Sequence, residues 1–141
     1  MVQSILVPVD GSELSARALD IAARSFVEPE ITVIHVIDPM NYVGGIGGEE
    51  APTDTIAEQR EQHAEDILED ARSHLESVDI ASAQEVRVGD VAREVVAFAD
   101  ASDTDHIVLG SHGRTGIERF LLGSVAEKVV RRSPVPVTVV R

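Results

Sequence analysis

The stretch SILVPVDGSELSARALDIAARSFVEPEITVIHVI, residues 4–37, holds two apolar runs separated by a helical pattern. The runs at 4–9 and 31–37 are almost continuously apolar, which is typical of strands buried on both faces of a parallel sheet. Between them, Ser12 can cap a helix over 13–26. One apolar face of that helix comprises Leu14, Ala18, Ile21, Ala22 and Phe26. The stretch therefore predicts a β-α-β unit with two parallel strands.

The same alternation continues through the rest of the chain. Further strands are expected at 83–88, 106–110 and 135–140, and further helices at 55–78, 91–101 and 125–132. The run at 83–88 is half polar and 135–140 alternates, so both are expected at sheet edges. An apolar edge strand at 135–140 also invites pairing with a second copy of the chain. The 141 residues therefore predict one domain, 1–141, with a doubly wound parallel α/β sheet.

Capping residues predict where the later helices begin. Thr55 and Glu58 have the spacing of a capping box, while Asp90 and Ser124 can cap the helices that follow them. The inward stripe of the longest helix is expected to comprise Ala64, Ile67, Leu68, Ala71, Leu75 and Val78. The acidic residues of the same helix are expected to form a solvated face.

Composition excludes several classes of function. The 25 acidic residues exceed the 12 basic ones, and the net charge of −13 disfavours nucleic acid and anionic membranes as partners. The absence of cysteine excludes disulfides, thiol catalysis and thiolate metal sites. No apolar run is long enough to span a membrane and no signal peptide is evident, so a cytoplasmic location is expected. Lysine-poor acidity is typical of halophilic hosts, and an ordinary acidic bacterial protein is the alternative.

Glycines recur in GSHGRTGIERFLLGS, residues 110–124, where a strand gives way to the last helix. Gly110 and Gly113 would let backbone N–H groups approach an anion closely, because no Cβ intervenes. The alternative is a glycine turn with no further purpose, which a short G-x-x-G alone would favour. The complete spacing, after a strand and before a helix, favours an anion cradle instead.

The end of this segment strengthens that interpretation. Gly123 and Ser124 open a helix, whose free N–H groups attract phosphate, and Arg114 is a cation suited to a terminal phosphate. In open α/β sheets ligands bind beyond the carboxyl ends of the strands, where the strand order reverses. If the first and fourth strands are neighbours there, Asp10 and Gly110 face each other across one crevice.

Two common nucleotide motifs are absent from the sequence. It contains no G-x-x-x-x-G-K-[ST] phosphate loop, and GGIGGEE does not have the G-x-G-x-x-G spacing. The glycine-rich segment 38–54 is too long for a simple loop, and is either a lid that nucleotide orders or an unstructured insertion.

The spacing Gly110-x2-Gly113-x9-Gly123-Ser124 resembles the ATP-binding motif of the universal stress protein family. The segments ILVPVDGS, VIHVID, VRVGDV and SPVPVTVVR support the resemblance in order along the whole chain. It implies a Rossmann-like, adenine nucleotide alpha hydrolase-like sandwich with strand order 3-2-1-4-5 and helices on both faces. It also implies a homodimer paired through the last strand, Val135 to Val140, and bound ATP with Mg²⁺ or Mn²⁺ held through the phosphates.

The resemblance also implies a role for individual residues. Those expected around the adenosine are Pro8, Val9, Asp10, the backbone of Val36, Gly89, Leu109, Gly110 and Ser111. Those expected around the phosphates are Gly113, Arg114, Gly123, Ser124, Val125 and Ala126. Asp10 would lie near the ribose hydroxyls or a metal. Two positions depart from the family pattern: Val9 stands where some members have threonine, and Gly116 adds flexibility to the phosphate loop. Both departures bear on the affinity for nucleotide.

The histidines do not suggest catalysis. Ser111 and His112 are adjacent on an extended loop and are expected to point apart, which disfavours a nucleophile–base pair. His35 lies among apolar residues of a strand and is expected to be a satisfied core histidine. His63 and His74 are separated by about 16 Å along one helix, too far to share a metal.

The sequence thus predicts an ATP-binding stress-response regulator that acts through nucleotide-dependent contacts with an unidentified protein. Three alternatives remain open. The first is a slow ATPase or a nucleotidyl or phosphoryl transferase, although no second acid or lysine neighbours Asp10 and no H-x-G-H motif occurs. The second is a dimeric stress protein that binds no nucleotide. The third is a related ligand, AMP or a cyclic nucleotide.

Overall fold

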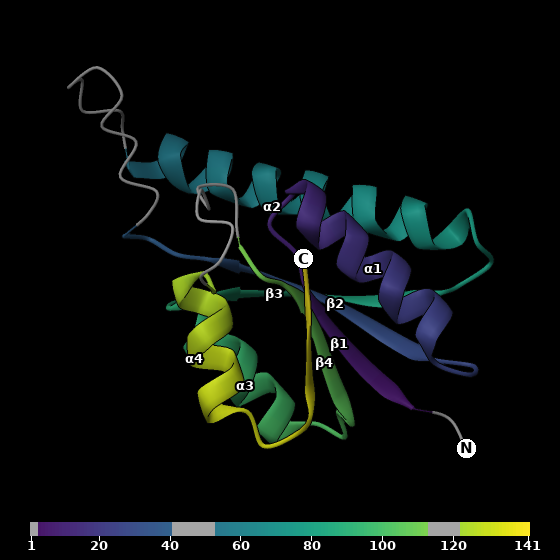
Figure 1. The fold of residues 1–141 in the computed structure, drawn as a ribbon. Coiled ribbons are helices and arrows are strands. Elements are labelled where there is room, and N and C mark those ends of the chain that lie inside the picture. The colour runs from purple at the N-terminus through teal and green to yellow at the C-terminus, as the bar shows by residue number, and fades with distance from the viewer. Residues whose placement is uncertain (1–2, 41–52, 113–121) are drawn as a thin grey trace.

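A computed structural model describes residues 3–40, 53–112 and 122–141 of the chain. Its five parallel strands lie in the order β3-β2-β1-β4-β5, which confirms the predicted topology (Figure 1). The strands are β1 (Ser4–Pro8), β2 (Glu30–Ile37), β3 (Ser82–Val88), β4 (His106–Gly110) and β5 (Val137–Val140). The helices are α1 (Glu13–Ser25), α2 (Thr53–Glu76), α3 (Val91–Ala101) and α4 (Ser124–Arg132).

The helices cover the sheet in two layers, with α1 and α2 on one face and α3 and α4 on the other (Figure 1). Successive residues of β1 enter opposite cores, because side chains alternate along a strand. Ile5 and Val7 pack in the core under α1 and α2, whereas Leu6 packs in the core under α3 and α4. This double burial is the reason that the central strands are apolar at nearly every position.

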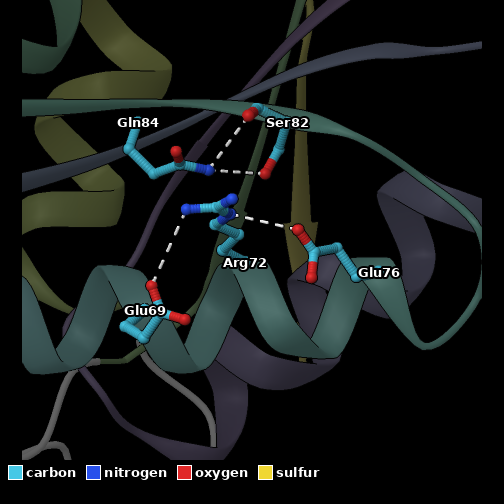
Figure 2. A network of polar contacts seen from close by, with 5 residues as sticks. All are labelled: Glu69, Arg72, Glu76, Ser82 and Gln84. Carbon is cyan, nitrogen blue, oxygen red and sulfur yellow. Dashed lines mark hydrogen bonds and ion pairs between the residues drawn. The ribbon is translucent and has the colours of Figure 1, made fainter.

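The edge strand β3 carries polar side chains on the side where α2 runs past it (Figure 2). On α2, the Nε atom of Arg72 lies 3.1 Å from Glu76 Oε1, and its Nη1 atom lies 3.9 Å from Glu69 Oε2. On β3, Gln84 Nε2 donates to both the Oγ atom and the carbonyl oxygen of Ser82, at 2.6 and 3.1 Å. From Glu58 to Glu76 the acidic residues of α2 are exposed, as predicted. Such exposed ion pairs contribute at most about 1 kcal/mol each.

Two predicted features of α2 are wrong. The helix begins at Thr53, so Thr55 lies inside its first turn and is not the start of a capping box. The helix ends at Glu76, before Val78, whose side chain is 51% exposed and does not join the inward stripe. The remaining members of that stripe are buried: Ala64, Ile67, Leu68, Ala71 and Leu75.

The predicted capping residues of α1 and α3 are confirmed. The side chain of Ser12 accepts a hydrogen bond from Ser15 N, and that of Asp90 accepts one from Arg93 N. The strand β5 begins at Val137, two residues later than predicted, and the carbonyl of Pro136 accepts a hydrogen bond from Ile107 N. Within the three described ranges, no helix combines the length and apolarity that crossing a membrane requires.

His106 makes the stability of the β4–β5 pair dependent on pH. Its Nε2 atom lies 2.7 Å from Thr138 Oγ1, and its ring packs edge-on against Phe26 with centroids 5.0 Å apart. Burial lowers the pKa of His106 below its ordinary value of 6.5, because the charged ring loses hydration. As pH falls below 6.5, the unfolded chain takes up this proton more readily than the folded one, so the free energy of unfolding decreases.

We therefore expect His106→Gln, which keeps a polar group near Thr138 but does not titrate, to flatten the pH dependence. Urea unfolding of both proteins between about pH 8 and about pH 5 measures the two slopes. Carboxylates titrate equally in both proteins, so the difference between the slopes isolates His106. Identical slopes would contradict the lowered pKa.

Candidate nucleotide-binding site

The turn after β1 is built by two short-range contacts and one glycine conformation. The Oδ1 atom of Asp10 accepts a hydrogen bond from Ser12 N at 2.9 Å, and Ser12 in turn caps α1. Gly11 has a φ of +83°, a conformation that favours glycine. Because β1 pairs with β4 in the sheet, the carboxyl end that carries Asp10 is adjacent to the one that carries Gly110. This confirms the neighbouring strands on which the predicted crevice depends.

The end of β4 is tied directly to the start of α4. Ser111 N donates to the carbonyl of Val140 on β5, and the carbonyl of Ser111 accepts from Gly123 N, both at 2.7 Å. A Cβ added at Gly123 would lie 3.0 Å from the Ser111 carbonyl oxygen and 3.3 Å from His112 Cα. Glycine at 123 is therefore required by the close approach of two backbones, which brings two predicted site residues together.

The N-terminus of α4 is the strongest anion-binding feature of the site. Gly123 is its N-cap and Ser124 is its first helical residue, so the predicted Ser124 cap is wrong. Glycine occupies the cap position because of the contact with Ser111, which leaves the helix without a capping side chain. The first intrahelical hydrogen bond runs from Glu127 N to Gly123 O at 2.9 Å. The N–H groups of residues 124–126 precede that bond, and with the helix dipole they favour an anion.

A pocket of about 200 Å³ opens beside this helix start, between the end of β2 and the start of α3. It is lined by Asp38, Asp90, Val91, Ala92, Ser124, Val125 and Lys128. Ser124 and Val125 are predicted phosphate residues, while Asp38 and Asp90 closely follow the predicted adenosine residues Val36 and Gly89. The pocket therefore includes two predicted phosphate residues and none of the predicted adenosine residues.

Lys128 is a pocket residue that the sequence analysis missed. It lies one helical turn after Ser124, is exposed, and forms no hydrogen bond or ion pair with any residue in the described part of the chain. Its ammonium is thus available to an anionic ligand. Two signals in the sequence could have identified it: it is the only lysine, and its i+4 spacing puts it on the same helix face as Ser124.

Four predicted residues have side chains that belong to the cores. Val9 packs under α1 and α2, whereas Val36, Leu109 and Ala126 pack under α3 and α4. Their side chains therefore do not reach a ligand, and the two backbone polar groups of Val9 are bonded to Ile34 and His35. Pro8 is the last residue of β1, next to this edge of the sheet.

Two predicted glycines have structural reasons of their own. Gly89 has a φ of +150°, and its N–H donates to the carbonyl of Ile37 at 2.9 Å. A Cβ added at Gly110 would lie only 2.8 Å from the Cβ of Leu14, so Gly110 lets α1 pack closely against β4. The predicted residues Gly113, Arg114 and Gly116, and positions 41–52 of the segment 38–54, lie outside the described residues.

Ser111 and His112 do not point apart as predicted. The Oγ atom of Ser111 lies 3.2 Å from Nδ1 of His112. Ser111 is only 3% exposed. The contact is local, as expected for His112, and a buried hydroxyl of this kind is poorly placed to attack a substrate. His35 is a satisfied core histidine, as predicted: it is 9% exposed and bonded to the carbonyl of Val9.

Metal ligation by side chains alone has little support. Among residues 3–40, 53–112 and 122–141, no three or more His, Asp or Glu side chains are grouped so that they could hold a metal ion. His63 and His74 make separate contacts, His63 with the ring of His35 and His74 with Asp20. Binding of Mg²⁺ or Mn²⁺ through the phosphates stays a prediction.

Comparisons with known proteins agree with this geometry. The model of the universal stress protein family matches residues 1–141. The universal stress protein MJ0531 of Methanocaldococcus jannaschii is 34% identical over 100% of this chain and 83% of its own length. The solved structure of MJ0577 from the same organism has a TM-score of 0.82 and 31% identity, covering 98% of this chain and 94% of that one.

Two further structures contain adenine nucleotides. A universal stress protein from Archaeoglobus fulgidus in complex with dAMP has a TM-score of 0.70 and 26% identity, covering 99% of this chain and 98% of that one. Another universal stress protein, in complex with cAMP, has a TM-score of 0.71 and 26% identity, covering 99% and 97%. Together with the strand order and the arrangement of the β4–α4 junction, these matches show that the chain belongs to the universal stress protein family.

Proposed function

We propose that this chain, as one domain over residues 1–141, binds ATP at the carboxyl edge of its sheet. Nucleotide occupancy would switch its contacts with another protein in a cytoplasmic stress response. The observation that carries the proposal is the uncapped N-terminus of α4, which opens onto the pocket between α3 and α4. The complexes of related proteins with dAMP and cAMP support an adenine nucleotide as the ligand.

The residues present fit a phosphate chain. The N–H groups of Ser124, Val125 and Ala126 and the hydroxyl of Ser124 offer donors at the positive end of a helix dipole. Lys128 adds a cation to the pocket and offsets one of the two carboxylates, Asp38 and Asp90, that also line it. These groups are hydrogen-bond donors and positive charges, as a phosphate chain requires.

The adenosine would be held by backbone groups and by the turn after β1. The side chains of Val9 and Val36 are buried in the cores, and both backbone polar groups of Val9 are bonded to β2. Val9 would therefore border a base by packing alone, and the backbone of Val36 would meet the edge of the base. Asp10 is partly exposed at the end of β1 and offers a carboxylate for ribose hydroxyls or for a metal. Mg²⁺ or Mn²⁺ bound through the phosphates would neutralise their charge when present. The adenosine contacts are the same whatever number of phosphates the ligand carries. AMP or a cyclic nucleotide therefore remains the alternative ligand.

The described residues favour binding over chemistry. The hydroxyl-bearing residue Ser111 is buried. In the described part of the chain, no three or more His, Asp or Glu side chains are grouped so that they could bind a metal ion for catalysis. Slow hydrolysis or group transfer is therefore the second candidate. We also propose a homodimer paired through β5, with Val135 to Val140 at the contact, because β5 is an edge strand with exposed backbone groups. The net charge of −13 supports protein rather than nucleic acid as the further partner.

The proposal is tested by purifying the protein without added nucleotide, denaturing it and identifying the released compounds by mass spectrometry. Isothermal titration with ATP, ADP, AMP and cAMP, with and without Mg²⁺, then ranks the ligands. ATP with Mg²⁺ is expected to bind most tightly. Detection of ATP or ADP in the released material would support binding, and their ratio bears on hydrolysis.

A negative charge placed at the start of α4 should lower ATP affinity without lowering the stability of the fold. Ser124→Asp puts a carboxylate in the first turn, where the dipole stabilises it by about 0.3–1 kcal/mol. The same carboxylate repels phosphate, so we expect ATP affinity to fall at least about tenfold while the melting temperature holds or rises. The matched control is Ser73→Asp, which makes the same change of charge at an exposed position of α2. Equal ATP affinity in both variants would rule out phosphate binding at α4.

A further inference from the structure

The carbonyl of Val9, just before the turn at residues 10–12, is bound by a side chain. The Nδ1 atom of His35 lies 2.7 Å from this oxygen, and His35 is only 9% exposed. A carbonyl oxygen can only accept, so Nδ1 must carry the proton and donate it. The contact therefore fixes the orientation and the protonated nitrogen of the His35 ring.

This bond extends the pairing of two strands beyond the end of their ladder. The register of β1 and β2 runs from Ser4↔Glu30 to Pro8↔Ile34, and Val9 N then donates to the carbonyl of Ile34 at 2.9 Å. The His35 side chain supplies the next donor, so both backbone polar groups of Val9 are held by β2. The chain is thereby fixed up to the residue that precedes Asp10.

The ring of His35 is supported from α2. The ring of His63 packs against it edge to face, with centroids 6.2 Å apart and planes at 86°. His63 is half-buried on the helix face that also carries the buried residues Ala64 and Ile67. The turn at residues 10–12 is thus connected through Val9 and His35 to helix α2.

We propose that His35 is a positioning residue of the nucleotide-binding site. By holding the Val9 carbonyl it sets the path of the backbone into Asp10 and Gly11, the turn that would border the adenosine. His35 itself does not touch the ligand. This inference rests on the proposed ATP binding, because the turn has a ligand to position only if nucleotide binds there.

The test compares ATP affinity in three variants by isothermal titration. His35→Phe keeps a planar ring but removes the donor, and we expect it to weaken ATP binding roughly tenfold. His35→Asn places an amide N–H near the position of Nδ1, and is expected to restore most of the affinity. The matched control is His106→Phe, another strand histidine bonded through its ring, at the amino end of β4 away from the site. It is expected to bind ATP as the wild type does.

Amide hydrogen exchange supplies a readout that a general loss of packing would not give. In His35→Phe, the amide of Ser12, which donates to Asp10, should exchange faster, while ladder amides such as that of Val7 keep their protection. If His35→Phe does not fold, His35→Gln, whose donor lies one bond further out, takes its place.

The outcomes separate the inference from the proposed function. If the wild type binds ATP and the His35 and His106 variants bind it equally, whether unchanged or equally weakened, the positioning role is overturned. If the wild type binds no adenine nucleotide, the proposed function fails, and the positioning role at that site fails with it. Exchange at Ser12 would then show only whether His35 orders the turn. Selective loss in His35→Phe with recovery in His35→Asn supports the inference.

Discussion

Leu75→Ala is expected to lower the free energy of unfolding by about 2–5 kcal/mol, one of the largest effects of a single substitution in this chain. Leu75 is 0% exposed and packs in the core between the sheet and helices α1 and α2. Removing its side chain leaves a cavity that the surrounding side chains fill only in part. Urea unfolding followed by circular dichroism measures the change.

The matched control is Val78→Ala, three residues further on. Val78 follows the end of α2 and is 51% exposed, so we expect its replacement to change the free energy of unfolding by no more than about 0.5 kcal/mol. A loss at Val78 comparable to that at Leu75 would mean that α2 continues beyond Glu76 and buries the next turn, as the sequence pattern suggested.

Gly110→Ala is expected to lower the free energy of unfolding by about 1–3 kcal/mol. The added methyl group would meet the Cβ of Leu14 at 2.8 Å, closer than packed carbon atoms tolerate, so α1 must move away from β4. The sign of this change in the free energy of unfolding shows why glycine occupies position 110. Where the native backbone tolerates alanine without strain, replacing glycine stabilises a protein by about 0.4–1 kcal/mol, by restricting the unfolded chain.

Thermal and urea unfolding of wild type and Gly110→Ala measure that sign. A gain in stability would contradict the close contact of α1 with β4, and would leave ligand approach as the main reason for glycine at this position. A loss would show that the glycine serves packing. ATP titration of the same variant then shows how far a displaced α1, whose cap Ser12 belongs to the adjacent turn, affects the site.

The sequence predicted the sheet well because the central strands are buried on both faces. Continuous apolar runs at β1, β2 and β4 have few other interpretations, and alternation with helices leaves a parallel sheet as the simplest solution. The end of α2 was harder to predict, because Val78 continues the helical spacing of apolar residues past the last helical turn. Val78 is exposed because the chain turns toward β3 after Glu76. The local spacing of apolar residues does not show where that turn occurs.

Which residues hold a nucleotide stays a prediction. Two of the predicted phosphate residues, Ser124 and Val125, line the pocket, and the glycine spacing identified them because it marks the start of α4. The cap of that helix was assigned to Ser124, since serine is the better capping residue, but the close contact between Gly123 and Ser111 places the cap one residue earlier. His35 contacts the carbonyl of Val9, 26 residues away in the sequence, and local patterns do not contain such a contact.

The position of Lys128 has a practical consequence. As the only lysine, it is the single side-chain amine of the chain, and it is exposed at the rim of the pocket. An amine-reactive fluorophore would therefore attach to one side chain, beside the helix start where the nucleotide is proposed to bind. Such a label also replaces the ammonium that is proposed to meet the phosphates, so its effect on ATP affinity would test that role in the wild-type sequence, without an engineered cysteine.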